Sequence, residues 1–212
     1  SSDVCSSDLF VIRLKGFDYD ENNCYLLMEY SSSLCLRSAF NWDFSQFKIE
    51  NCMSIFASLL IGISTIHKYN IVHRDVKPEN VIINKDGSIK LIDFGLSKYM
   101  KNYTSTIIGT PYYMAPEVIQ GNGYDKSIDY WSVAVLVYEM LYRKNPFELK
   151  NDINVMNIYK KILKCQVEYP SIEETNHINE YKKNEKGKLE ELPQKNVDFG
   201  GGLERITAAL ND

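Results

Sequence analysis

The sequence lacks the residue patterns of several common protein classes. Its five cysteines are scattered without a Cys-x-x-Cys pair, and its three histidines are not spaced as metal ligands. We therefore expect neither a disulfide scaffold nor a zinc site, and scattered thiols are typical of the reducing cytoplasm. The longest apolar stretch, residues 55–66, is too short and too interrupted to cross a bilayer, and no charged start leads into a hydrophobic signal segment. These absences predict a cytoplasmic protein that does not act at a membrane.

The sequence also lacks an excess of positive charge. Its net charge is −4 over 212 residues, which argues against nucleic-acid binding as the main function. Hydrophobic residues make up 44% of the chain and charged residues 25%, which is ordinary for a soluble globular protein. The length allows one domain or two small ones, and the composition gives no indication of the oligomeric state.

The most informative stretch is a polar loop followed by a short triplet. Residues 73–80 read His-Arg-Asp-Val-Lys-Pro-Glu-Asn, and Asp93-Phe94-Gly95 follows them. Between the two, residues 81–83 and 89–92 read as strands, and Asp86-Gly87 supplies the positive φ angle that a short turn needs. The pattern therefore predicts a β-hairpin.

This hairpin would bring Asn80 and Asp93 to the same end. Two oxygen donors then face one point, which is what a Mg²⁺ ion carried by ATP requires. Asp75, on the same loop, could accept a proton from a substrate hydroxyl. Lys77 could lie beside a phosphoryl group in transfer.

At these residues the chain resembles a eukaryotic-type serine/threonine protein kinase. The catalytic loop, the Asp-Phe-Gly triplet and Ala115-Pro116-Glu117 occur in the family's order and at its spacings. The resemblance implies an α+β fold with a partial β small lobe and a mainly helical large lobe, truncated at both ends. It implies transfer of the γ-phosphate of ATP, with Mg²⁺, to serine or threonine hydroxyls of protein substrates. Lys77 and Thr110 fit the serine/threonine pattern and not the tyrosine pattern.

The resemblance also implies roles for single residues at the nucleotide. Asp75 would be the catalytic base, which mainly orients the hydroxyl, and Lys77 a second catalytic residue on the phosphate. Met28 would lie at the back of the adenine pocket and Ile82 beneath the adenine, although both could equally be core residues. The implied ATP-binding residues are Met28, Glu29, Ser31, Lys77, Asn80, Ile82 and Asp93, with Asn80 and Asp93 as metal ligands.

Four further residues are implied to have structural roles. His73 would pack beneath Phe94 and support the site without donating protons. Asp129 would accept hydrogen bonds from the backbone of the catalytic loop, and Glu117 would pair with an arginine. His67, by contrast, is expected at a helix end without a catalytic task.

Residues 96–116 correspond to the activation segment of the family. Arg74 would accept a phosphate on this segment, since arginine and phosphate form paired hydrogen bonds. The candidate acceptors are Thr104, Ser105 and Thr106, and the position of Thr106 before Gly109 favours it. An unmodified surface loop is the alternative.

The later motifs look most like the cyclic-nucleotide-dependent and related kinases. In that group, residues at the positions of Glu79 and Glu139 recognise an arginine upstream of the phosphorylation site, and Thr110 also positions the substrate. A third acidic position, near the hinge, is Cys35 here, which departs from a strongly basophilic pattern. The motifs lie at residues 129–132, 145–147 and 155–163.

Hydrophobic periodicity predicts the main elements. Residues 10–17 and 24–30 read as strands, and residues 127–141 and 155–163 as helices. A helix is also predicted over residues 47–69, with one apolar face formed by Ile49, Met53, Phe56, Leu59, Leu60, Ile63 and Ile66.

The two ends depart from the kinase pattern. No Gly-x-Gly-x-x-Gly motif, no lysine strand and no helix with its partner glutamate precede residue 10, so we expect the chain as given to be inactive. Residues 1–9 read as foreign sequence or a disordered terminus. We predict a partial kinase domain over residues 10–170 and an unrelated tail over residues 171–212.

The tail resembles a fragment of alanyl-tRNA synthetase over residues 180–212. A poorly ordered tail with a chance glycine cluster is the alternative. For the whole chain, a non-catalytic, pseudokinase-like interaction fragment and an aminoacyl-tRNA synthetase fragment remain alternative functions. The residues that carry the synthetase resemblance are Val197, Asp198, Gly200, Gly202, Leu203, Glu204 and Arg205.

Overall fold

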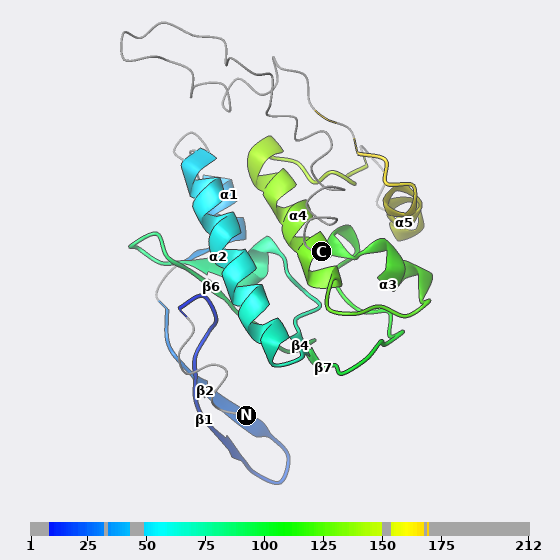
Figure 1. The fold of residues 1–212 in the computed structure, drawn as a ribbon. Coiled ribbons are helices and arrows are strands. Elements are labelled where there is room, and N and C mark those ends of the chain that lie inside the picture. The colour runs from blue at the N-terminus through cyan, green and yellow to red at the C-terminus, as the bar shows by residue number, and fades with distance from the viewer. Residues whose placement is uncertain (1–8, 32–33, 43–48, 150–153, 168, 170–212) are drawn as a thin grey trace, which may run out of the picture.

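The protein combines a projecting β-hairpin with a mainly helical body (Figure 1). The structure, a computed structural model, describes residues 9–31, 34–42, 49–149, 154–167 and 169. The predicted α+β arrangement is confirmed in these residues. The boundaries predicted at residues 9 and 170 stay predictions, and the tail with its synthetase-like residues lies outside the described part.

The hairpin is formed by β1 (Leu14–Tyr19) and β2 (Cys24–Met28), which pair antiparallel. Its turn is held by Asp20, whose Oδ1 accepts hydrogen bonds of 2.8 Å from the backbone N–H groups of Asn22 and Asn23. The predicted first strand begins too early. Residues 10–12 instead pair with Leu91, which donates its N–H to Phe10 O at 2.8 Å and accepts from Ile12 N at 2.9 Å. This segment therefore ties the hairpin to the body.

A second sheet carries the catalytic loop. Its strand order is β3 (Leu34–Cys35), β5 (Val81–Ile83) and β6 (Ile89–Leu91). The predicted hairpin of β5 and β6 is confirmed, with Val81 opposite Leu91. Gly87 in its turn has φ +83°, a conformation that glycine adopts without steric cost.

The core lies between α2 (Ile49–Lys68) and α4 (Ile128–Tyr142). α4 is buried around most of its circumference, which fits its continuous apolar sequence. The predicted face of α2 is partly wrong, because Met53 is 48% exposed. The buried residues of α2 include Cys52, Ile55, Leu59, Ile63 and Ile66.

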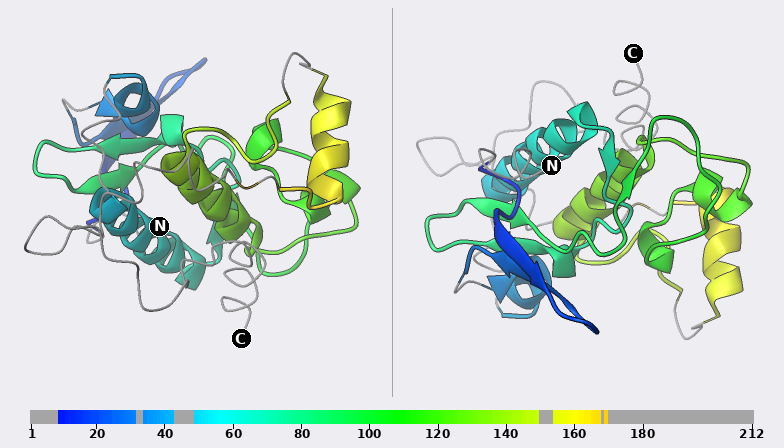
Figure 2. Two further views of the ribbon diagram at one scale, coloured as in Figure 1. Left: turned by 90° about the horizontal axis from the view of Figure 1, so that it is seen from above. Right: turned by 90° about the horizontal axis from the view of Figure 1, so that it is seen from below.

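Short elements complete the body. α1 (Leu36–Trp42), which the sequence reading did not predict, lies against β5 and the 3-10 helix η2 (Pro78–Asn80). α5 (Val155–Leu163) is where it was predicted and packs beside α3 (Pro116–Gln120) (Figure 2). The remaining elements are β4 (Ile71–Val72), β7 (Lys98–Tyr99) and η3 (Pro111–Tyr113).

Within the described residues, no helix combines the length and the apolar character needed to cross a membrane. The four cysteines of this part, Cys24, Cys35, Cys52 and Cys165, are free thiols.

Candidate active site

A buried carboxylate shapes the catalytic loop. Asp129, in the first turn of α4, accepts hydrogen bonds from the backbone N–H groups of His73 at 2.9 Å and Arg74 at 2.8 Å. Arg74 has φ +68°, which is sterically unfavourable for a residue with a side chain. The two hydrogen bonds hold the loop in this conformation, so Asp129 determines where the following residues point.

His67 is a third hydrogen-bond donor to the same carboxylate, and the sequence did not reveal it. The ring is buried, and its Nε2 donates to Asp129 Oδ2 at 2.8 Å. The residue does lie near the end of α2, as predicted. Its contact depends on the packing of α2 against α4, which no local pattern encodes.

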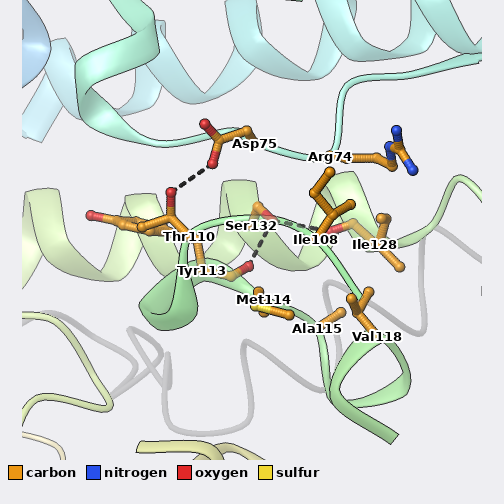
Figure 3. Close-up of a pocket in the computed structure, with 10 residues that line it drawn as sticks. All are labelled: Arg74, Asp75, Ile108, Thr110, Tyr113, Met114, Ala115, Val118, Ile128 and Ser132. Atoms are coloured by element: carbon orange, nitrogen blue, oxygen red, sulfur yellow. Dashed lines mark hydrogen bonds between the residues drawn. The ribbon is translucent and has the colours of Figure 1, made fainter. Parts of the chain in front are cut away.

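Asp75 is the centre of the site. Its side chain is buried, and Thr110 Oγ1 donates to its Oδ1 at 2.6 Å (Figure 3). Asn80 Nδ2 donates to its Oδ2 at 3.1 Å, and Lys77 Nζ lies 2.7 Å from the same oxygen. Lys77 also donates to Thr110 Oγ1 at 3.0 Å. Two residues of the same loop and one residue of a distant segment thus hold this carboxylate in place.

These contacts decide the charge of Asp75. Burial by itself would raise the pKa of the carboxyl group, but the hydrogen bonds from Lys77 and Thr110 outweigh it and hold the pKa below its ordinary value. Asp75 is therefore ionised at neutral pH. It can accept a hydrogen bond from a hydroxyl and orient it, while Lys77 supplies a positive charge nearby.

Asn80 and Asp93 provide oxygen donors at the end of the β5–β6 hairpin. Ile92 N donates to Asn80 O at 2.9 Å, which joins the two ends. Asn80 uses its Nδ2 on Asp75, and its Oδ1 accepts no hydrogen bond from the described residues. Asp93 is exposed and has φ +62°, with Gly95 N donating to its Oδ1 at 3.1 Å.

This donor set fits a hard divalent cation. An amide oxygen and a carboxylate are ligands that Mg²⁺ prefers, and Mg²⁺ commonly keeps only one or two protein ligands beside phosphate and water. In residues that the structure describes, no three His, Cys, Asp or Glu side chains gather around one point. A cation held by Asn80 and Asp93 would therefore take its other ligands from a nucleotide and from water.

His73 supports the triplet from below. Its ring contacts Phe94 edge-on, with 4.9 Å between ring centroids, and its Nε2 donates to Ile92 O at 2.9 Å. Burial lowers the pKa of the imidazole, and the nearby Asp129 opposes this only in part. The ring is neutral at pH 7 and supports the site by packing against Phe94.

Three of the residues expected at the adenine lie on or just after β2. Met28 is 47% exposed, so the alternative that it is a core residue is wrong. Glu29 pairs with Lys90 at 2.7 Å, and Ser31 Oγ donates to Asn84 Oδ1 at 2.9 Å. Ile82 is half-buried in β5.

The activation segment brings a lysine to the candidate phosphorylation site. Thr106 is exposed, and its Oγ1 lies 3.4 Å from Thr104 Oγ1. Lys98 Nζ donates to Thr104 Oγ1 at 2.7 Å. Arg74 instead donates its Nε to Leu96 O at 2.6 Å and extends away from Asp75 (Figure 3). Lys98 was not among the predicted site residues, although its place shortly after Asp-Phe-Gly is a signal for such a contact.

Glu79 and Glu139 are held by one arginine that the sequence reading did not single out. Arg37, on α1, places its Nε 2.8 Å from Glu79 Oε1 and its Nη1 2.5 Å from Glu139 Oε1. Its Nη2 donates to the hydroxyl of Tyr113 at 2.9 Å, and that hydroxyl donates to Glu139 Oε2. Burial and the charge of Glu139 raise the pKa of Tyr113, which therefore stays protonated.

Glu117 lies half-buried in the first turn of α3. No arginine or lysine of the described residues forms an ion pair with it. Its predicted structural role therefore stays a prediction.

The α+β fold and the cluster of Lys77, Asn80 and Thr110 around Asp75 characterise the site. Comparison with known proteins names its family. The family profile described as "Protein kinase domain" matches residues 5–198, and the chain belongs to this family.

Curated relatives place the chain near one group. Human cAMP-dependent protein kinase catalytic subunit PRKX is 38% identical over 163 residues, which cover 76% of this chain and 44% of the relative. The cAMP-dependent protein kinase catalytic subunit 3 of Drosophila melanogaster is 38% identical over 162 residues, which cover 76% of this chain and 27% of the relative. Saccharomyces cerevisiae cAMP-dependent protein kinase type 3 is 36% identical over 163 residues, which cover 76% of this chain and 39% of the relative. The predicted likeness to cyclic-nucleotide-dependent kinases is confirmed, and the chain spans less than half the length of these relatives.

Proposed function

We propose that this chain carries the catalytic centre of an ATP-dependent serine/threonine protein kinase. The observation that supports this most is the ionised Asp75, held at once by Lys77, Thr110 and Asn80. A single carboxylate fixed by three partners suits a reaction whose rate depends on positioning and charge neutralisation.

Each residue of the site has a part in this proposal. Asp75 orients the hydroxyl of a protein serine or threonine and accepts its proton. Lys77 stabilises negative charge beside Asp75. Thr110 holds the side chains of Asp75 and Lys77 in position through its hydroxyl. Asn80 and Asp93 would hold Mg²⁺, and Met28, Glu29, Ser31 and Ile82 would line the adenine site. When bound, ATP supplies the phosphoryl group and Mg²⁺ neutralises its phosphates.

We also propose that phosphorylation of Thr106 regulates the site. A phosphate there would add about two negative charges and strong acceptors near Lys98. Lys98 lies within the segment and Arg74 on the catalytic loop, and charge-assisted hydrogen bonds from both to the phosphate would order the segment. The scattered free thiols agree with a cytoplasmic location, which belongs to the same proposal.

Nucleotide titration of the 212-residue chain tests the proposed function. Isothermal titration calorimetry should show ATP binding that requires Mg²⁺ and is lost in Asp93→Ala. The matched control is Asp86→Ala, which removes an exposed carboxylate from the turn of the same hairpin and should bind as the parent does. Absence of binding at ATP on the order of 1 mM would overturn the proposal. ATP binding that does not require Mg²⁺ and persists in Asp93→Ala would favour the non-catalytic alternative.

A further inference from the structure

A wide cavity of about 690 Å³ adjoins the catalytic cluster. Lys77, Asn80 and Thr110, which surround Asp75, form one side of it. A peptide whose hydroxyl lies at Asp75 would place neighbouring side chains in this cavity. Its charged lining therefore bears on which peptides fit.

Arg37 occupies the acidic part of this lining. Its guanidinium group uses three nitrogens on three partners, Glu79, Glu139 and Tyr113, which come from η2, α4 and η3. Glu139 is buried, so little water reaches its charge. The planar guanidinium can bridge two carboxylates in a way that the point charge of a lysine cannot.

The consequence for a substrate is electrostatic. Without Arg37, two carboxylates would face the cavity and attract a cationic side chain. With Arg37 in place, both are paired within the protein, and the lining holds four cationic side chains against three acidic ones. A further guanidinium would meet Arg37 itself and would have to displace it.

We propose that Arg37 occupies the acidic part of this cavity, where an arginine of a substrate would otherwise bind. Arg37 would thereby make the kinase discriminate against substrates that place an arginine in the cavity. The inference rests on the proposed function, because it treats the cavity as a peptide site. Glu79 and Glu139, the residues expected to recognise an arginine of the substrate, hold an arginine of this chain instead. The substrates that fit carry an uncharged or acidic side chain at this position.

Binding of a small arginine analogue tests this without measuring catalysis. The probe is N-acetylarginine amide, with the uncharged N-acetylcitrulline amide as its matched ligand, titrated into the ¹⁵N-labelled 212-residue chain by NMR. Arg37→Ala should bind the arginine probe at least about tenfold more tightly than the parent, as expected for hydrogen bonds to charged groups. The citrulline probe should not distinguish the two proteins.

Two further variants sharpen the test. Arg143→Ala removes another cation that lines the cavity and should bind the probe as weakly as the parent. Glu79→Gln added to Arg37→Ala should weaken binding again, because one carboxylate is lost. If Arg37→Ala does not fold, Arg37→Lys should still bind the probe more tightly than the parent, since lysine leaves one carboxylate unbridged.

The inference is overturned if the parent binds the probe as tightly as Arg37→Ala, or if the folded variant does not bind it. Neither result depends on ATP. If the parent chain shows no Mg²⁺-dependent ATP binding, the proposed function is rejected. The effect of Arg37 on binding of the arginine probe can still be measured in that case.

Discussion

Thr110 Oγ1 donates a 2.6 Å hydrogen bond to Asp75 Oδ1 across 35 positions of sequence. This contact joins the activation segment to the catalytic loop. The orientation of the Asp75 carboxylate therefore depends on where the segment lies, and a change in the segment is transmitted to Asp75 directly.

Replacing this hydroxyl should change the titration of Asp75. Thr110→Val keeps the side-chain shape but removes a hydrogen bond that stabilises the carboxylate, so the pKa of Asp75 should rise toward its ordinary value. A carbon-detected NMR titration of the carboxyl groups would measure it. Thr104→Val, in the same segment but without contact to Asp75, is the control. An unchanged pKa of Asp75 in Thr110→Val would contradict this account.

Asp129→Asn should destabilise the protein by about 2–3 kcal/mol, because hydrogen bonds to a buried charged group are lost. The NH₂ group that replaces one carboxylate oxygen can only donate, so the backbone N–H of residue 73 or of residue 74 loses its acceptor. Urea unfolding would measure the loss. Asp125→Asn is the matched control, since this exposed carboxylate accepts one backbone N–H, from Ser127 at 2.8 Å. Equal effects in both variants would show that Asp129 does not anchor the loop.

Gly109→Ala should cost roughly 1–3 kcal/mol through backbone strain alone. Gly109 has φ +125°, and an added Cβ would lie 3.0 Å from Arg74 O, where the segment crosses the loop. Gly16→Ala is the comparison, because no atom lies within 4 Å of its added Cβ. Thermal and urea unfolding of both variants would give the difference. A Gly109→Ala protein as stable as Gly16→Ala would contradict the strain expected at Gly109.

The free energy of unfolding should fall as the pH drops below about 6.5, owing to His73. Its pKa in the folded protein lies below the ordinary 6.5, so the unfolded chain takes up the proton first. The stabilisation is present above this pH and decreases by at most about 1.4 kcal/mol per pH unit for one group. Carboxylates with a lowered pKa, such as Asp75, titrate below this range.

Urea unfolding at about pH 7.5 and pH 5.5 measures this slope. His73→Phe keeps a ring against Phe94 but cannot titrate, so the variant should show a smaller loss of stability over the same interval. The same pH dependence in both proteins would assign the effect to other groups.

Local patterns were sufficient for much of the fold. The apolar runs and the Asp-Gly turn predicted β5 and β6, and continuous hydrophobicity predicted α4 and α5, because these elements depend on neighbours within a few residues. The same hairpin placed Asn80 and Asp93 at one end. Met53 was assigned to the wrong face of α2, since several phases of a helical pattern fit a sequence with scattered apolar residues.

The sequence by itself determined the family, the catalytic loop and the hairpin that follows it, because each is written in contiguous residues. Only the tertiary structure decided which side chains meet across the site. Arg37 reaches Glu79 across 42 positions and Glu139 across 102, and it lies on a short helix without a clear periodic signal. His67 reaches Asp129 across 62. Such pairings arise when packed helices bring distant residues together, and the charge that a substrate meets depends on them.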